Sequence, residues 1–132
     1  MSTDGAAPMS VVLVEDHQMI AESMRMAIEQ SGGMRVAGVG RTLAEGAQLV
    51  RSERPDVAVV DFRLPDGEAS QVIAEYIAIH PALRVMVVSA TADSRAVIGA
   101  LEAGASGYML KDQTLDELIA AINSSSVWSL SM

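Results

Sequence analysis

Polar side chains that could do chemistry follow four apolar runs of the sequence, each at the point where the run ends. The run VVLV is followed by Glu15 and Asp16, VAVV by Asp61, VMVV by Ser89 and YML by Lys111. Carboxylates can bind a hard divalent cation or attack phosphorus, while a hydroxyl and an ammonium group stabilise the charge of a transferring group. These residue types favour group-transfer chemistry if the fold brings them together.

The apolar runs have the length and composition of buried strands. Three of them are continuous and rich in valine, as expected for strands of a parallel sheet that are covered on both faces. Two weaker candidates complete the set. The five predicted strands cover residues 11–14, 35–40, 57–60, 85–88 and 107–110.

Helical segments are expected between the strands, because apolar residues recur there at spacings of three and four. Thr42 with Glu45, and Thr114 with Glu117, match the capping-box pattern of helix starts. The apolar positions used for this prediction are Ile20, Met24, Ala27, Ile28, Val72, Ile73, Tyr76, Ile77, Ile79, Val97, Ile98, Leu101, Leu115, Leu118, Ile119 and Ile122.

Strands alternating with helices predict an α/β fold: a flavodoxin-like, doubly wound five-stranded parallel sheet of order 2-1-3-4-5 with five helices. In such a sheet, ligands bind beyond the carboxyl ends of the strands, where the strand order reverses. The polar residues should therefore meet in one crevice. Clustered carboxylates repel one another, and Mg²⁺ would remove that conflict. Asp61 ends the central strand, which makes it the best-placed nucleophile for an aspartyl-phosphate.

Composition excludes several classes of protein. Half of the 132 residues are apolar and a fifth are charged, which fits one globular domain. The net charge of -8 disfavours direct binding of this chain to nucleic acid or to acidic membranes. The absence of cysteine rules out disulfides and thiolate metal sites, and no apolar run is long enough to cross a bilayer. We therefore expect a cytoplasmic protein without membrane association.

The domain organisation follows from local composition. Residues 1–9 are small, polar or Pro/Gly and are expected to form a disordered leader. Residues 10–123 are expected to form the single folded domain, because no shift of composition divides them. Residues 124–132 begin with a serine cluster and are interpreted as a linker or an artificial tail.

Taken in order, the stretches VVLVEDHQMI, RPDVAVVDFRLPDGEAS, VMVVSA and EAGASGYMLKD resemble the receiver domain of bacterial two-component response regulators over nearly all of residues 10–123. The VEDH opening and the LEAGASGYMLKDQTLDELIAAI ending resemble the NarL/FixJ (LuxR-type) subfamily most. This resemblance implies a phosphorelay switch served by a histidine kinase, with at most self-phosphorylation and slow self-dephosphorylation of its own. It also implies transcription regulation through a C-terminal helix-turn-helix DNA-binding domain absent from this chain. Apolar residues left on the fourth and fifth predicted helices offer a surface for a homodimer, although core packing is the commoner use of such residues.

The resemblance also implies a role for each site residue. Asp61 would be the phosphoacceptor and, with Asp16, would bind Mg²⁺, while Glu15 would be the second member of the acidic pair. The backbone carbonyl of Arg63 would complete the protein ligands, since the turn Leu64-Pro65-Asp66-Gly67 leads the chain away behind it.

Three further residues would stabilise the phosphoryl group or change conformation in response to it. Lys111 would contact it directly, and Ser89 would be the switch hydroxyl, at a position where this family more often has threonine. Tyr108 would be the aromatic switch residue, and this role depends entirely on the resemblance.

Three other classes of protein share part of this pattern. A dehalogenase-like phosphatase also uses a strand-end aspartate, but it needs a second aspartate two residues later, where this chain has Arg63. A flavin or nucleotide module would need a small-residue phosphate cradle after the first strand, where this chain has EDHQ. A receiver-like interaction scaffold that is never phosphorylated is the principal alternative, because it would carry the same side chains.

Overall fold

A computed structural model describes residues 8–90, 93–112 and 114–123. Most of the expected leader and all of the expected tail at 124–132 lie outside these residues. The first strand begins at Met9, one residue before the expected start of the folded domain. Within the described ranges, no helix combines the length and the apolar character that a bilayer span requires.

Five parallel strands form the central sheet in the order β2-β1-β3-β6-β7. This arrangement confirms all five predicted strands and the predicted order, in which the second strand lies at one edge. Every residue of the central strand is buried, which explains its continuous apolar sequence. The strands are β1 (Met9–Val14), β2 (Met34–Gly40), β3 (Val57–Asp61), β6 (Arg84–Ser89) and β7 (Gly107–Leu110).

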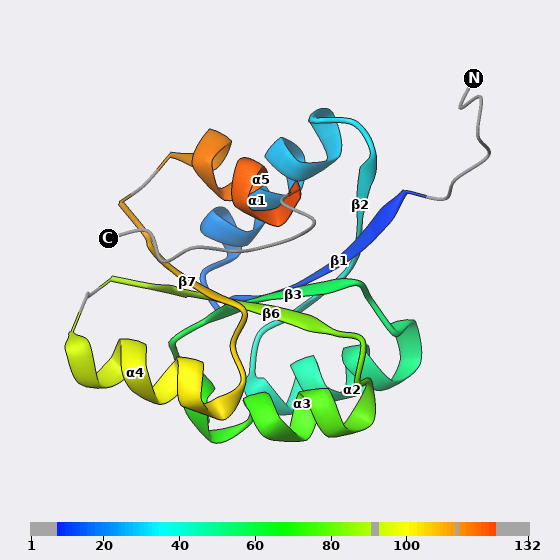
Figure 1. Ribbon diagram of the computed structural model, residues 1–132. Helices are drawn as coiled ribbons and strands as arrows, with labels where there is room; N and C mark the ends of the chain where they lie inside the picture. The colour runs from blue at the N-terminus through cyan, green and yellow to red at the C-terminus, as the bar shows by residue number, and fades with distance from the viewer. Residues whose placement is uncertain (1–7, 91–92, 113, 124–132) are drawn as a thin grey trace.

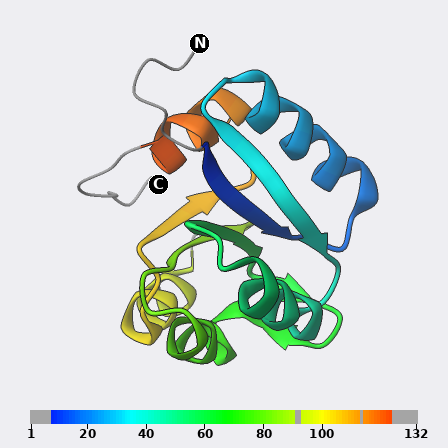
Figure 2. The ribbon, with the colours of Figure 1, turned by 90° about the vertical axis from the view of Figure 1, so that its right-hand side faces the viewer.

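Helices cover both faces of the sheet, as Figures 1 and 2 show. One face is covered by α1 (Gln18–Gln30) and α5 (Leu115–Asn123), and the other by α2 (Leu43–Glu53), α3 (Ile73–Ile79) and α4 (Ser94–Ala103).

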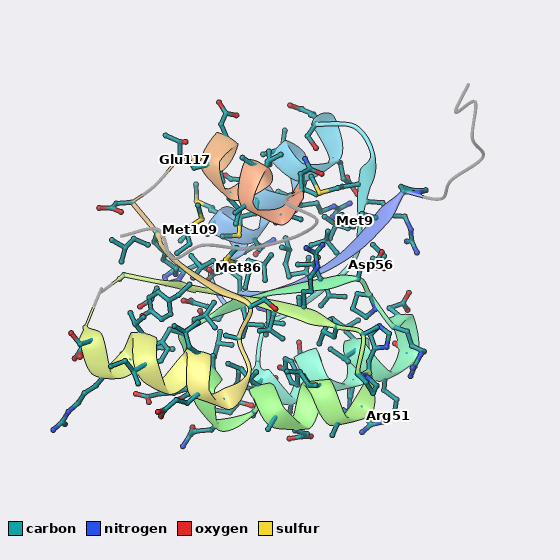
Figure 3. All side chains as sticks on the ribbon, viewed as in Figure 1. Met9, Arg51, Asp56, Met86, Met109 and Glu117 are labelled. Atoms are coloured by element: carbon teal, nitrogen blue, oxygen red, sulfur yellow. The ribbon has the colours of Figure 1, made fainter. Side chains whose placement is uncertain are left out.

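Alternate strand residues supply the two halves of the core. In β1, Val11 and Leu13 pack on the α1 and α5 side, and Val12 and Val14 pack on the opposite side. Met86 and Met109 also lie on the α1 and α5 side, between the sheet and these helices (Figure 3).

The capping signals identified the starts of two helices. Before α5, the Glu117 N–H donates to Thr114 Oγ1 at 3.2 Å and the Thr114 N–H donates to Glu117 Oε1 at 3.0 Å, which is the complete predicted capping box. Before α2, the Glu45 N–H donates to Thr42 Oγ1 at 3.0 Å. The Glu45 carboxylate accepts instead from the Arg41 N–H, so this capping box is only half formed.

A small hairpin after β3 was not predicted. Its strands β4 (Arg63–Leu64) and β5 (Gly67–Glu68) pair antiparallel around the Pro-Asp turn, and the 3₁₀ helix η1 (Ala69–Gln71) follows. The sequence indicated a turn here, but two-residue strands are too short to produce a recognisable alternating pattern. The hairpin matters because it begins two residues after Asp61.

Candidate functional site

The carboxyl ends of β1, β3, β6 and β7 surround one pocket of about 210 Å³. The structure therefore brings together the polar groups that the sequence predicted to converge. Glu15 is buried beside the pocket wall, with 3% of its surface exposed. The lining residues are Asp16, His17, Asp61, Arg63, Ser89, Ala90 and Lys111.

The Lys111 ammonium group links two buried carboxylates. It donates to Asp61 Oδ2 at 2.9 Å and lies 3.3 Å from Glu15 Oε1. The other Glu15 oxygen accepts the His17 N–H at 3.0 Å. The single positive charge of Lys111 thus forms ion pairs with two buried carboxylates, Glu15 and Asp61.

This environment changes the acid strength of the groups. Burial raises the pKa of Asp61 from 3.8 to about 6, the Lys111 hydrogen bond opposes that rise, and the Glu15 charge adds to it. Burial acts to lower the pKa of Lys111, but its hydrogen bond and attraction to Asp61 outweigh this, so its pKa is raised. Near neutral pH, Asp61 is therefore largely ionised and Lys111 is protonated.

The oxygen donors around the pocket fit a magnesium ion. Ligand atoms of Glu15, Asp16 and His17 lie within 4.8 Å of one another, and Asp16 keeps 34% of its side chain exposed. Asp61 lies outside that tight group but lines the same pocket as Asp16. Because Lys111 does not balance three carboxylates, a hard divalent cation would remove the remaining repulsion.

Arg63 lines the pocket while its side chain extends into solvent. The guanidinium is 3.8 Å from the Glu68 carboxylate and 5.8 Å from the centre of the Phe62 ring, with 77% of the side chain exposed. The Ala69 N–H donates to the Phe62 carbonyl, so Arg63 and Glu68 form a non-hydrogen-bonded pair of the hairpin. In such a pair the Arg63 carbonyl points away from the partner strand, which leaves it available as a ligand.

The predicted switch residues Ser89 and Tyr108 are both buried. Ser89 lines the pocket, and its carbonyl accepts the Lys111 N–H at 2.7 Å. Tyr108 packs in the core on the α2, α3 and α4 side, with its ring centre 6.4 Å from that of Phe62. Phe62 directly follows Asp61, and its contact with Tyr108 was not predicted because a lone apolar residue carries no functional signal in the sequence.

A family model and similar known proteins both identify the family of this chain. Residues 11–123 match the family model described as the response regulator receiver domain, so the chain belongs to this family. Receiver domains of transcriptional regulators are signalling switches of two-component systems. The fold and the subfamily resemblance predicted from sequence are thereby confirmed.

Similar curated proteins are transcriptional regulators. The chain is 33% identical over 122 residues to the probable transcriptional regulatory protein NarL of Mycobacterium tuberculosis, covering 92% of this chain and 56% of that protein. It is 34% identical over 112 residues to the DNA-binding transcriptional activator DevR/DosR of the same species, covering 85% and 52%. The chain thus spans about half the length of these relatives.

Solved structures show the same architecture. The signal receiver domain of the putative response regulator NarL from Mycobacterium tuberculosis superposes with a TM-score of 0.84 at 32% identity, covering 89% of this chain and 94% of that one. A LuxR-family two-component response regulator from Aurantimonas sp. SI85-9A1 gives a TM-score of 0.82 at 30% identity, covering 88% and 83%.

Proposed function

We propose that this chain is the phosphoacceptor module of a response regulator and that Asp61 receives a phosphoryl group from a histidine kinase. The observation that carries this proposal is the buried Asp61 carboxylate, 2.9 Å from Lys111 Nζ, in a pocket that Asp16 and Ser89 also line. As the Asp61 oxygen bonds to phosphorus, the P–N bond to the donor imidazole breaks, and the imidazole keeps the electron pair and takes up a proton. Lys111 and the Ser89 hydroxyl stabilise the transferring group.

Magnesium is the proposed cofactor. Asp16, Asp61 and the Arg63 backbone carbonyl would hold it, and Glu15 would add negative charge from the buried side of the site. When bound, Mg²⁺ supplies positive charge to the phosphoryl oxygens. Lys111 keeps Asp61 oriented toward the pocket by its hydrogen bond.

Phosphorylation is proposed to switch a partner surface through Ser89 and Tyr108. The phosphoryl charge attracts the Ser89 hydroxyl, and the Tyr108 ring is favoured in the inward position that it occupies beside Phe62. The surface formed by α4, β7 and α5 changes as a result. This is a shift between pre-existing states, because the charge can only favour a conformation that it stabilises differentially.

We infer the wider role from the relatives. They are transcriptional regulators, and the match to this chain covers only 56% and 52% of their length, so we infer that a helix-turn-helix domain beyond these residues would contact DNA. We place the protein in the cytoplasm with a histidine kinase as phosphodonor. Exposed apolar residues on α4, Ile98 and Leu101, make this helix a candidate face for a homodimer, which sedimentation before and after phosphorylation would test.

The test is incubation with a small phosphodonor and Mg²⁺, followed by intact-mass measurement. The wild-type chain should gain one phosphoryl group and lose it slowly in isolation, and Asp61→Asn should gain none. Asp112→Asn changes an exposed carboxylate next to Lys111 and should behave like wild type.

Two outcomes would contradict the proposal. A wild-type chain that gains no phosphoryl group would favour the unphosphorylated scaffold. Multiple turnover on phosphate esters would favour a phosphatase, although the exposed Arg63 side chain, paired with Glu68, stands where that class needs an acid.

A further inference from the structure

Asp66, at the tip of the hairpin, is bonded to the start of α2. Its Oδ1 accepts the Leu43 N–H at 2.8 Å and its Oδ2 accepts the Ala44 N–H at 3.1 Å. These are the first two residues of α2, whose N–H groups have no acceptor within the helix. A carboxylate 23 residues away from Leu43 therefore caps the helix and fixes the hairpin tip with the same two bonds.

Neighbouring contacts fix the rest of this corner. The buried Tyr76 hydroxyl of α3 donates to the Leu43 carbonyl at 2.7 Å, so the start of α2 is held from α3 as well. At the base of the hairpin, the Glu68 N–H donates to Gln71 Oε1 at 2.8 Å. Gly67 has φ +143°, and a Cβ there would lie 2.6 Å from the same Gln71 oxygen. Both the backbone conformation and the lack of space therefore favour glycine at this position.

The hairpin is too small to hold its own position. It contains two residue pairs, Arg63 with Glu68 and Leu64 with Gly67, and an isolated two-stranded hairpin is at best marginally stable in water. Its placement beside the pocket therefore depends on contacts with the rest of the fold, which include the buried Leu64 side chain and the bonds of Asp66. The Asp66 bonds to α2 form the anchor at the tip, opposite the end that continues from Asp61.

We propose that Asp66 is a positioning residue for the metal: by bonding to the start of α2, it holds the hairpin where the Arg63 carbonyl faces the pocket. This inference rests on the proposed function, which assigns that carbonyl as a Mg²⁺ ligand. Asp66 is not among the residues that line the pocket, so it acts through the backbone of the hairpin. The low pKa that the Leu43 N–H gives to Asp66 keeps this anchor ionised near neutral pH.

Asp66→Ala, Asp66→Asn and Thr42→Ala separate positioning from helix stability. Thr42→Ala removes the other cap of α2, the bond from the Glu45 N–H, and leaves the hairpin anchor intact. Mg²⁺ affinity is measured by isothermal titration calorimetry, and phosphorylation by a small phosphodonor is measured as a function of Mg²⁺ concentration.

Asp66→Ala should bind Mg²⁺ about tenfold more weakly, the usual scale for groups that orient a metal ligand. Asp66→Asn should fall between it and wild type, because its amide oxygen can still accept a hydrogen bond. Thr42→Ala should keep the wild-type affinity. At saturating Mg²⁺, all three variants should reach the wild-type phosphorylation rate, since the Asp61 and Lys111 pair is untouched.

Equal losses of Mg²⁺ affinity in Asp66→Ala and Thr42→Ala would overturn the inference, because affinity would then follow the stability of α2. Wild-type affinity in a folded Asp66→Ala variant would overturn it too. If Asp66→Ala does not fold, Asp66→Asn decides the matter by the same comparison. A wild-type chain that binds no Mg²⁺ would instead refute the proposed function, and this inference with it.

Discussion

At the scale of single residues, Asp61 places an ionised carboxylate where folding alone would disfavour one. Burial and the Glu15 charge raise its pKa, and the Lys111 contact only partly compensates. An ionised Asp61 therefore lowers the stability of the fold, and the same carboxylate is the one proposed above to accept the phosphoryl group. Perturbed pKa values of this kind cluster at functional sites, which agrees with the proposed role of Asp61.

Replacing Asp61 should stabilise the metal-free protein. The folded-state pKa of about 6 lies above the ordinary value of 3.8. The loss of folding free energy caused by ionised Asp61 is therefore absent below about pH 4 and complete above about pH 6. Asp61→Asn should raise the unfolding free energy by about 2–3 kcal/mol near pH 7, and the gain should shrink toward zero near pH 4. Urea unfolding across this range measures it, and a pH-independent gain would show that the charge is not its cause.

Replacing Lys111 should have the opposite effect on stability. Lys111→Met leaves Glu15 and Asp61 buried without their shared cation and should lower the unfolding free energy by about 3 kcal/mol in metal-free buffer. It should also slow phosphorylation by about 100-fold, because it removes charge stabilisation from the transferring group. Lys111→Arg keeps the charge and should recover most of the stability. A Lys111→Met variant as stable as wild type would contradict this account of the pair.

At the scale of elements, α2 packs against β1 and α3 at Gly46, where there is no space for a Cβ atom. A Cβ on Gly46 would collide with the Tyr76 hydroxyl and would lie 2.9 Å from Val14 Cγ2. That hydroxyl donates to Leu43 at the start of the same helix. A residue that is unfavourable for helix formation in isolation is thus required by the packing of β1, α2 and α3.

Two glycine-to-alanine variants should therefore change stability in opposite directions. Gly46→Ala should lower the unfolding free energy by about 2 kcal/mol, because overpacking and the disturbed Tyr76 bond outweigh the better helix propensity of alanine. Gly99→Ala in α4 meets nothing within 4 Å and should raise it by about 0.5–1 kcal/mol. Thermal or urea unfolding measures both. A stabilised Gly46→Ala variant would show that α2 can shift without cost.

At the scale of the whole molecule, the net charge of -8 and the acidic pocket make stability sensitive to cations. Monovalent salt screens the surface charges, whereas a divalent cation bound in the pocket would neutralise Asp16, Asp61 and Glu15 directly. The two effects differ in concentration dependence, since binding saturates at a stoichiometric site and screening does not.

Mg²⁺ should raise the thermal midpoint by mass action. At a concentration ten times its dissociation constant, it should add about 1.4 kcal/mol to the unfolding free energy. Sodium chloride at matched ionic strength should add less, and Asp16→Ala should remove the difference between the two salts. Equal shifts in both salts would mean that screening, and not site binding, stabilises the protein.

Much of the site could be predicted because short stretches of sequence identify the strands and the residues at their ends. Continuous valine-rich runs identified the strands, and in a parallel sheet their ends must meet at one edge, which placed Asp16, Asp61, Ser89 and Lys111 together. The pairing of Thr114 with Glu117 is equally local and was confirmed. The capping box predicted for Thr42 and Glu45 is only half formed, because the Glu45 carboxylate accepts the Arg41 N–H and not the Thr42 N–H.

The sequence by itself determined the strand order, the family and the residues at the carboxyl edge of the sheet, since each follows from a periodic pattern or a motif. Only the tertiary structure decided which carboxylates share the Lys111 ammonium, that Phe62 touches Tyr108 and that Asp66 caps α2. These contacts join residues far apart in the chain. Their geometry is set by how the elements pack, and no spacing within the sequence specifies it.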